Sequence, residues 1–412
     1  MQNIRAETRR PEWPYGFLTG EQRSWSGRRP EPFRQVVLKI HSRCNLSCTY
    51  CYVYHQADQG WRSQPTVMSR RTVAATAGRV ADHVHRHGLA AIEIVLHGGE
   101  PLLAGAGMLD DLVTVFREAA PPHTRIAFSI QTNAVLLDER MLELCLRHGI
   151  GVGVSIDGGA EHHNRRRVRR DGASSLAGTH VGLERLTSER FRAAFAGLLC
   201  VIDLDSDPVE VYESLLAWRP PGVDFLLPHG NWLVRPAGRV EDETLAPYAD
   251  WLIALFERWY TAPEHETSLR LFDEIIALLL GGRSRVETVG LTPSTVIVVE
   301  TDGSIEQVDA LKSAYHGAAL TGLHVERDDF DAALGHPGIV ARQIGVEALG
   351  EECARCSIHR VCGGGYYPHR YRPGSGFRNR SVYCADLFKL IVHIGDRIHA
   401  DLEPVRRRLG QA

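Results

Sequence analysis

Residues 35–51 read QVVLKIHSRCNLSCTYC, an apolar run followed at once by three cysteines within eight residues. The run at 36–40 predicts a β-strand, so the cysteine loop begins where that strand ends. Three thiolates spaced as Cys44-x3-Cys48-x2-Cys51 can each hold one iron of a [4Fe–4S] cube. The fourth iron is then open to a small chelating ligand, which indicates iron that touches a substrate rather than an ordinary electron carrier.

The aromatic Tyr50 stands just before the last cysteine of this loop, where its ring could stack against an adenine. A zinc site completed by His41 or His55 is the alternative interpretation, because structural zinc takes four ligands. Motifs further along the chain favour iron.

The 412 residues suffice for about two or three structural units. With 47 basic and 50 acidic side chains the net charge is only −3, so we expect neither nucleic acid nor a membrane as partner. No signal sequence and no run of about 18 apolar residues occurs, which predicts a cytoplasmic protein.

Seven of the nine cysteines fall in two tight clusters, which indicates metal ligands in a reducing compartment rather than disulfides. The other two, Cys145 and Cys200, lie in apolar segments and are predicted to be inert core thiols. Almost all basic residues are arginine; the lysines are Lys39, Lys312 and Lys389, a bias that we attribute to genome composition.

Residues 1–34 are rich in Arg, Pro and Gly without a period and predict an N-terminal arm. From residue 35 onward, short apolar segments alternate with helical patterns, which predicts parallel strands with right-handed crossovers. The predicted strands are 36–40, 92–96, 126–130, 151–156, 193–202 and 223–227. The predicted helices are 69–87, 108–119, 138–148, 174–187 and 207–218. We therefore expect an α/β fold with an open, partial (β/α)6 barrel over 35–235.

Polar motifs follow five of these strands at their carboxyl ends, the edge where barrel enzymes build their sites. Besides the cysteine loop they are Gly98-Gly99-Glu100-Pro101, Gln131-Thr132-Asn133, Ser155-Ile156-Asp157-Gly158 and Pro228-His229-Gly230-Asn231. One Gly-Gly pair alone is more often a turn than a ligand site. Five motifs on one edge predict an active site.

The cysteine motif with its tyrosine resembles the signature of the radical S-adenosylmethionine superfamily, and residues 98–101 resemble its GGEP motif. The segment 163–167 resembles the HNxxR segment of that family, although most of Arg165–Arg170 is read as a solvated basic loop. The resemblance implies a [4Fe–4S] cluster on the three cysteines, with S-adenosylmethionine chelated to the open iron and cleaved to a 5′-deoxyadenosyl radical. The residues implied around S-adenosylmethionine are Tyr50, Gly98, Gly99, Glu100, Pro101, Asn133, Ser155, Asp157 and Arg167.

Beyond the barrel, helical patterns at 241–260 and 269–280 predict bridging helices within 236–285. Asp302-Gly303 then predicts a hairpin between strands at 295–300 and 304–308.

Four further cysteines, spaced C-x2-C-x5-C with a distant fourth, resemble the SPASM module of radical enzymes that modify peptides. They are Cys353, Cys356, Cys362 and Cys384. The resemblance implies a SPASM/twitch-like α+β domain over 286–412 with a fully capped auxiliary [4Fe–4S] cluster. A complete module has more cysteines, where Tyr366 and Val308 stand here, so we expect two clusters in all rather than three. A four-cysteine zinc site is the alternative.

Four strings resemble the FxsB-like maturases of ribosomally made peptides: Lys39–Leu46, Cys51–Tyr54, Leu226–Gly230 and Gly363–Tyr371. These maturases are similar to cyclophane-forming enzymes, which join an aromatic ring carbon to the Cβ of a residue two positions on. The resemblance implies a ribosomal precursor peptide as substrate and an electron donor such as flavodoxin or ferredoxin. The reaction also needs a base, for which the candidates are Asp309, Glu306, His229 and Tyr366.

Two other functions stay open. A sulfatase-maturating Ser/Cys oxidase of the same superfamily is the alternative enzyme, and the missing SPASM cysteines count against it. A non-catalytic metal-binding regulator is the alternative of another class, and iron content with S-adenosylmethionine cleavage would separate it from either enzyme.

Overall fold

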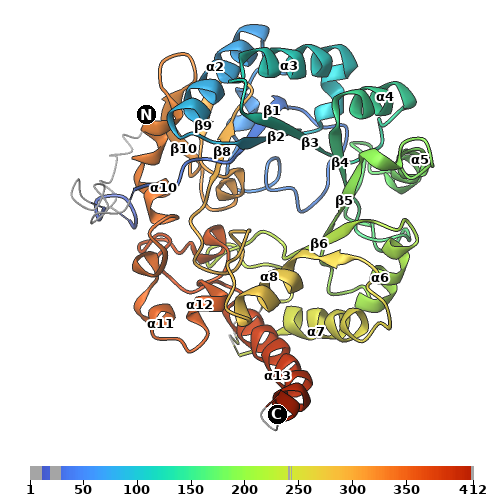
Figure 1. The fold of residues 1–412 in the computed structure, drawn as a ribbon, viewed down its shortest axis with the longest axis vertical. Helices are drawn as coiled ribbons and strands as arrows, with labels where there is room; N and C mark the ends of the chain where they lie inside the picture. The colour runs from blue at the N-terminus through green and yellow to red at the C-terminus, as the bar shows by residue number, and fades with distance from the viewer. Residues whose placement is uncertain (1–11, 19–28, 240–241, 243, 410–412) are drawn as a thin grey trace, which may run out of the picture.

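The computed structural model describes residues 12–18, 29–239, 242 and 244–409, and its centre is one ten-stranded sheet (Figure 1). The strand order is β10-β9-β8-β1-β2-β3-β4-β5-β6-β7. The strands are β1 (Gln35–His41), β2 (Ala91–Gly98), β3 (Arg125–Thr132), β4 (Ile150–Ser155), β5 (Phe195–Val201), β6 (Gly222–Leu226), β7 (Ser268–Leu269), β8 (Val296–Val299), β9 (Ser304–Glu306) and β10 (Leu320–His324).

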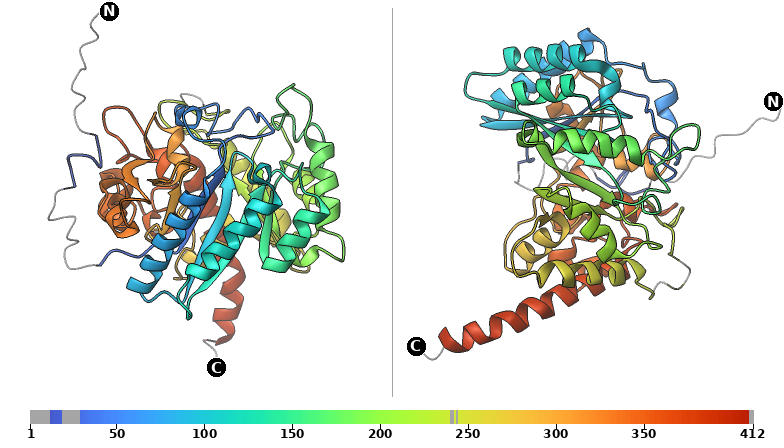
Figure 2. Two further views of the ribbon diagram at one scale, coloured as in Figure 1. Left: turned by 90° about the horizontal axis from the view of Figure 1, so that it is seen from above. Right: turned by 90° about the vertical axis from the view of Figure 1, so that its right-hand side faces the viewer.

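Strands β1 to β6 are parallel neighbours in chain order, as the alternating sequence pattern predicts. The helices between them lie along the outside of the curved sheet (Figures 1 and 2). They are α2 (Arg70–Arg86), α3 (Gly105–Ala119), α4 (Glu139–His148), α5 (Leu176–Leu186) and α6 (Pro208–Leu216). Along β2, fully buried side chains alternate with partly exposed ones, so the two faces of the strand lie in different surroundings. The predicted partial barrel is confirmed.

Local capping explains where the helices begin and end. Ser69 accepts a hydrogen bond from the Thr72 amide at the start of α2. Asp138 does the same for α4, which ends at Gly149 in the left-handed conformation. The predicted strand 193–202 begins later, at Phe195, because a 3-10 turn precedes it.

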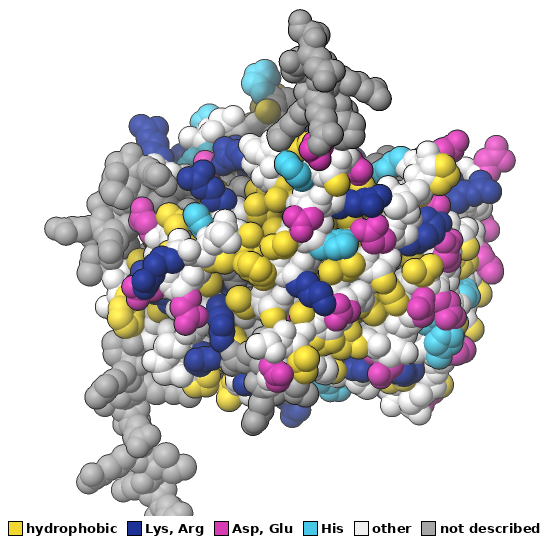
Figure 3. Space-filling model, turned by 90° about the horizontal axis from the view of Figure 1, so that it is seen from below, with side chains coloured by type: hydrophobic (Ala, Val, Ile, Leu, Met, Phe, Trp, Pro, Cys, Tyr) yellow, Lys and Arg dark blue, Asp and Glu magenta, His cyan; other side chains and the backbone are white. Residues whose placement is uncertain are grey.

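The chain after β6 supplies α7 (Pro247–Tyr260) and α8 (Arg270–Leu279), close to the two predicted bridging helices. Shorter helices follow: α9 (Phe330–Leu334), α10 (Pro337–Ala341), α11 (Glu351–Ala354) and α12 (His359–Cys362). The last helix, α13 (Cys384–Leu409), packs on α7 and α8 and then projects away from the body (Figures 1 and 2). The face of the molecule seen from below carries hydrophobic side chains in its middle, with charged ones interspersed (Figure 3).

The predicted hairpin around Gly303 is present, and it extends the barrel sheet rather than forming a separate one. Strand β8 pairs in parallel with β1, with Val36 opposite Ile297, and β9 pairs antiparallel with β8. The turn between them uses Gly303 at a φ of +99°, which favours glycine. Strands from before and after residue 286, where the C-terminal domain was expected to begin, therefore belong to one and the same sheet.

The described part of the N-terminal arm lies on the C-terminal region. Trp13 is buried, pairs with Gly376 through its backbone, and lies under the Arg378 guanidinium at 4.9 Å from its ring centroid. Residues 1–11 and 19–28 of the predicted arm lie outside the described residues. Among the helices that the structure describes, none is both long and apolar enough to cross a bilayer.

Candidate active site

The cysteine loop leaves β1 and brings three thiols together. The Cys51 amide donates to the Cys48 carbonyl at 3.0 Å, which closes a tight turn. Burial, with smaller contributions from the nearby Glu100, Cys48 and Cys51, raises the pKa of Cys44 to about 12. Thiols that raise one another's pKa deprotonate together only around a cation, so this loop fits a metal cluster.

Gly98, the last residue of β2, and Gly99 directly after it allow the end of that strand to pack closely against the cysteine loop. The Gly99 amide donates to the His41 carbonyl at 2.8 Å. A Cβ on Gly99 would lie 1.9 Å from the Tyr54 hydroxyl and 2.5 Å from the Arg43 carbonyl carbon, and one on Gly98 would lie 2.2 Å from the His41 oxygen. No larger residue fits either position without moving the loop.

Glu100 joins the glycine motif to the end of β3. Its buried carboxylate accepts hydrogen bonds from the Leu102 amide (3.0 Å), the Thr132 hydroxyl (2.7 Å) and the Asn133 amide (2.9 Å). Burial raises its pKa, and these donors oppose that effect. Pro101 then begins the 3-10 turn Pro101–Ala104, where its missing amide costs nothing. The expected contact of Glu100 with a substrate amino group stays a prediction.

Asn133 brings the third motif to the cysteine loop. Its side-chain amide donates to the Asn45 side chain at 2.8 Å and lies 3.9 Å from the Cys44 sulfur. Ser155, at the end of β4, accepts a hydrogen bond from Gln131 at 2.9 Å.

Tyr50, Asp157 and Arg167 meet on the other side of the loop. The Tyr50 hydroxyl donates to the Asp157 carboxylate at 2.8 Å and accepts from the Arg167 guanidinium at 2.7 Å. Burial raises the pKa of Asp157, while Arg167 lowers it. The sequence-predicted cofactor residues thus surround the three cysteines from several strands, although their contacts with S-adenosylmethionine stay predictions.

Asp309, one of the four candidate bases, lies near the same loop. Its Oδ2 lies 2.6 Å from the Lys39 ammonium and accepts a hydrogen bond from the Tyr52 hydroxyl at 2.9 Å. Burial alone would raise its pKa, but the Lys39 charge holds that pKa well below its usual range. Asp309 is therefore an ionised hydrogen-bond acceptor whose side chain is only 15% exposed.

His229 and Tyr366 lie close to Asp309. The His229 ring stands edge-on to Tyr52 at 4.7 Å between centroids and lies 6.1 Å from the Tyr366 ring. Burial lowers the pKa of His229 to about 4, so it is neutral at physiological pH. Burial raises the pKa of Tyr366, which is therefore a phenol. Three of the four candidate bases thus share one region.

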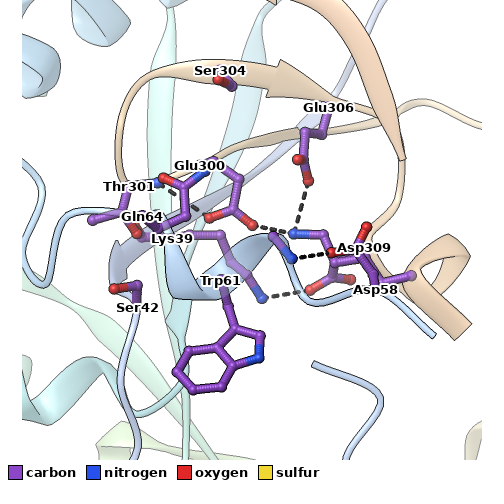
Figure 4. A network of polar contacts seen from close by, with 12 residues as sticks. Lys39, Ser42, Asp58, Trp61, Gln64, Glu300, Thr301, Ser304, Glu306 and Asp309 are labelled. Carbon is purple, nitrogen blue, oxygen red and sulfur yellow. Dashed lines mark hydrogen bonds and ion pairs between the residues drawn. The ribbon is translucent and has the colours of Figure 1, made fainter. Parts of the chain in front are cut away.

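Glu306 belongs to a neighbouring ion-pair network (Figure 4). The ammonium of Lys312 lies 2.9 Å from Glu306 and also pairs with Glu300. Burial raises the pKa of Glu306 to about 7, and the Lys312 charge opposes the shift. Through its ion pair with Lys312, Glu306 joins β9 to the 3-10 helix Asp309–Ser313.

The second cysteine set lines a cavity of about 280 Å³ together with Gly364, Arg380 and Phe388. All four predicted ligands border it: Cys353, Cys356, Cys362 and Cys384. Burial, with smaller contributions from the Cys384 and Cys353 thiolates, raises the pKa of Cys362 to about 12. Four converging thiols fit a metal centre, which leaves both the auxiliary cluster and the zinc alternative open.

Other side chains, Tyr366 and Val308, occupy the positions where a complete SPASM module has cysteines. Tyr366 is partly buried near Arg342. The Arg342 charge lowers the pKa of this tyrosine, and the larger effect of desolvation raises it. Arg342 in turn pairs with Glu287 at 2.5 Å. Val308 is buried in an apolar cluster that includes Leu311.

Residues 38–186 match the Radical SAM superfamily. This stretch is a radical SAM domain. It reaches from β1 to the end of α5 and so contains the cysteine loop, the glycine motif and the loop that bears Arg167.

Outside the radical SAM domain the likeness to known enzymes continues. The chain is 25% identical over 359 residues to the cysteine-type anaerobic sulfatase-maturating enzyme of Clostridium perfringens, covering 86% of this chain and 94% of that protein. It is 21% identical over 387 residues to the serine-type enzyme of Bacteroides thetaiotaomicron, covering 88% and 90%.

Solved structures share most of this fold. Native anSMEcpe with bound AdoMet superposes with a TM-score of 0.73 at 22% identity, covering 89% of this chain and 98% of that one. Streptococcus suis SuiB bound to precursor peptide SuiA gives 0.55 at 14% identity, covering 86% and 76%. The expected fold is confirmed, and the chain is an enzyme that contains a radical SAM domain over residues 38–186, a domain that implies a [4Fe–4S] cluster and S-adenosylmethionine.

Sequence reasoning missed three residues of the radical SAM domain: Lys39 and Tyr52, which contact Asp309, and His97, which contacts Lys39. Tyr52 appeared in the sequence only within the string Cys51–Tyr54, with no role assigned to it. The signal for Lys39 was its rarity, because lysine is almost absent from a chain rich in arginine.

Proposed function

We propose that this enzyme oxidises the β-carbon of a residue in a bound polypeptide, as a Ser- or Cys-type oxidase similar to the sulfatase-maturating enzymes. Relatives spanning most of this chain are of that type. Related folds have been solved with peptides, namely anSMEcpe with Kp18Cys peptide and SuiB with SuiA. The crosslinking reaction expected from the sequence is retained as a second candidate.

The observation that carries the proposal is the Asp309 carboxylate. Its side chain is only 15% exposed, it is held ionised by Lys39, and it accepts a hydrogen bond from Tyr52, the residue directly after the predicted cluster ligand Cys51. An ionised carboxylate beside the cluster loop is placed to take a proton from a substrate group bound there.

When bound, the cluster and S-adenosylmethionine supply the capacity to remove a hydrogen atom from an unactivated carbon. Cys44, Cys48 and Cys51 would hold that cluster. Asp309 takes the proton that the substrate hydroxyl or thiol loses as its bond to Cβ becomes double. A hydrogen atom, a proton and an electron leave the substrate, which makes a two-electron oxidation. The second cysteine set would hold the group that accepts the electron.

An aromatic–Cβ crosslink is the second candidate because two cysteine positions of a complete SPASM module hold other residues in this chain. Tyr366 and Val308 stand where a complete SPASM module has cysteines, and sulfatase-maturating enzymes usually carry that complete set. The crosslink needs the same removal of hydrogen from Cβ. Its proton comes instead from the ring carbon as aromaticity returns, and Asp309 can accept it equally well.

The test uses anaerobically reconstituted enzyme and two peptides, one with an internal serine and one ending in an aromatic-x-Ser motif. Either reaction lowers the peptide mass by about two units with one deoxyadenosine per event. An aldehyde trapped by hydrazine identifies serine oxidation. A missing series of backbone fragments between the aromatic residue and the third residue identifies the crosslink.

Deuterium at Cβ of the reacting residue must appear in deoxyadenosine, and Asp309→Asn enzyme should still form deoxyadenosine while product is lost. Deuterium that arrives from Cα, or an unchanged peptide mass with both peptides, would contradict β-carbon oxidation.

A further inference from the structure

Lysine is scarce in this chain, and two of its three lysines are buried in one polar network. The sequence has 47 Lys and Arg residues, of which only Lys39, Lys312 and Lys389 are lysines. Lys389 is about half exposed and pairs with Asp250. Lys39 and Lys312 instead lie within the network of Figure 4. In a chain that uses arginine by default, a buried lysine marks a place that needs a compact ammonium rather than a planar guanidinium.

The Lys39 ammonium has an acceptor for each of its three hydrogens. Its Nζ lies 2.6 Å from Asp309 Oδ2, 3.1 Å from His97 Nδ1 and 3.5 Å from the Gly98 carbonyl oxygen. The Lys39 side chain is 3% exposed. Burial, together with the Lys39 charge, lowers the pKa of His97 to about 4, so this ring is a neutral acceptor. A guanidinium could not direct three donors to these converging acceptors.

The contacts of Lys39 join two parts of the site. Asp309 lies in the 3-10 helix Asp309–Ser313 after the hairpin, whereas Gly98 ends β2 in the glycine motif. Lys39 lies on β1 between them, five residues before Cys44. A displacement of the glycine motif would therefore move the Lys39 ammonium and, with it, the Asp309 carboxylate.

We propose that Lys39 is a positioning residue: it holds the Asp309 carboxylate in place as proton acceptor and ties that carboxylate to the backbone of the glycine motif. The inference rests on the proposed function of Asp309. The charged and titratable groups that act on Asp309 or are acted on by it are Lys39, Tyr52, His97, His229, Lys312 and Tyr366. Of these, Lys39 makes the ion pair, and Lys312 is occupied by Glu300 and Glu306.

The test compares wild-type enzyme with Lys39→Met, which keeps the length of the side chain and removes its charge. Lys389→Met is the matched control, because it removes an exposed lysine far along the chain in α13. Deoxyadenosine and modified peptide are each measured between about pH 6 and pH 9. Iron content and thermal unfolding are recorded for every variant.

We expect Lys39→Met enzyme to keep forming deoxyadenosine while modified peptide falls at least about tenfold at neutral pH. The remaining product should increase with pH, because a buried carboxylate without its ammonium partner ionises only at higher pH. Lys389→Met enzyme should match wild type in both measurements. Product formation by Lys39→Met enzyme with the wild-type rate and pH profile would overturn the proposal. So would equal loss of deoxyadenosine and product at every pH in a folded, iron-replete variant.

A measurement without substrate separates this inference from the proposed function and does not need Lys39→Met to fold. The infrared difference spectrum between wild-type and Asp309→Asn enzyme at about pH 5 should contain a carboxylate band. A carboxylic acid band there would overturn the inference, because Lys39 would then not hold Asp309 ionised. If the carboxylate band is present but no peptide is ever modified, only the proposed function fails.

Discussion

Arg167 donates a hydrogen bond of 2.7 Å to the hydroxyl of Tyr50 and thereby fixes a ring that stands just before the last cysteine of the cluster loop. The two residues are 117 positions apart; Tyr50 donates a hydrogen bond to Asp157, and the charge of that carboxylate raises the pKa of the buried Arg167. The loop after β4 is thus part of the wall around the three cysteines, and its charge acts on them.

Replacing Arg167 by methionine should weaken cluster assembly. Burial raises the pKa of Cys48 and Arg167 lowers it, so the variant makes this thiol harder to deprotonate. We expect less iron per chain after reconstitution and weaker binding of S-adenosylmethionine, measured by iron analysis and by equilibrium dialysis. Arg170→Met, an exposed arginine in the same loop, is the control. Wild-type iron content in the Arg167 variant would contradict the assigned role.

Replacing Gly99 by alanine should distort the cysteine loop. The new Cβ would meet the Tyr54 hydroxyl and the Arg43 backbone, and overpacking of this kind costs about 1–3 kcal/mol. Gly107→Ala is the control, since a Cβ there meets nothing within 4 Å and should add about 0.5–1 kcal/mol of helix stability. Urea unfolding of both variants measures the difference. Equal free energies of unfolding for the Gly99→Ala and Gly107→Ala variants would mean that the end of β2 is not closely packed against the cysteine loop.

Replacing Cys353 and Cys384 together by serine should remove one cluster and leave the other. Wild-type enzyme should hold about eight irons per chain and the double variant about four, since each cube carries four. Cys145→Ala, at a buried thiol in α4, should leave the iron count unchanged. Bound zinc with about four irons in the wild type would instead support the zinc alternative for this cavity.

Replacing Glu306 by glutamine should flatten the pH dependence of stability. Burial raises the folded-state pKa of this carboxyl to about 7, above its unfolded value. Between about pH 4.5 and pH 7 the folded state then binds more protons than the unfolded state, so wild-type stability falls as pH rises through this window. Denaturation midpoints at both ends of the window should differ less in Glu306→Gln than in wild type. Glu139→Gln, an exposed control, should follow the wild type.

The sequence was sufficient for features that depend on neighbouring residues. The strand–helix alternation and the turn at Gly303 each follow from local periodicity or turn chemistry. The alignment of motifs along one edge followed from parallel pairing, which brings all carboxyl ends together.

The sequence could not indicate contacts that depend on the path of the whole chain. Lys39 and Asp309 are 270 positions apart, and their pairing exists only because β8 lies beside β1. A short strand such as Val296–Val299 carries no signal for the partner strand it will choose. The same reason kept Glu306 among the candidate bases, although it forms an ion pair with Lys312 in the fold.

The parallel pairing of β8 with β1 has a consequence for how the molecule can be divided. An expression fragment that stops near residue 285 would leave one side of β1 without partners, and such an open edge invites aggregation. Slow amide exchange is expected along β1, which lies between β2 and β8 with a strand on each side. The β8–β9 hairpin and the strand that leads into the first cysteine set are therefore expected to unfold together, as one cooperative unit.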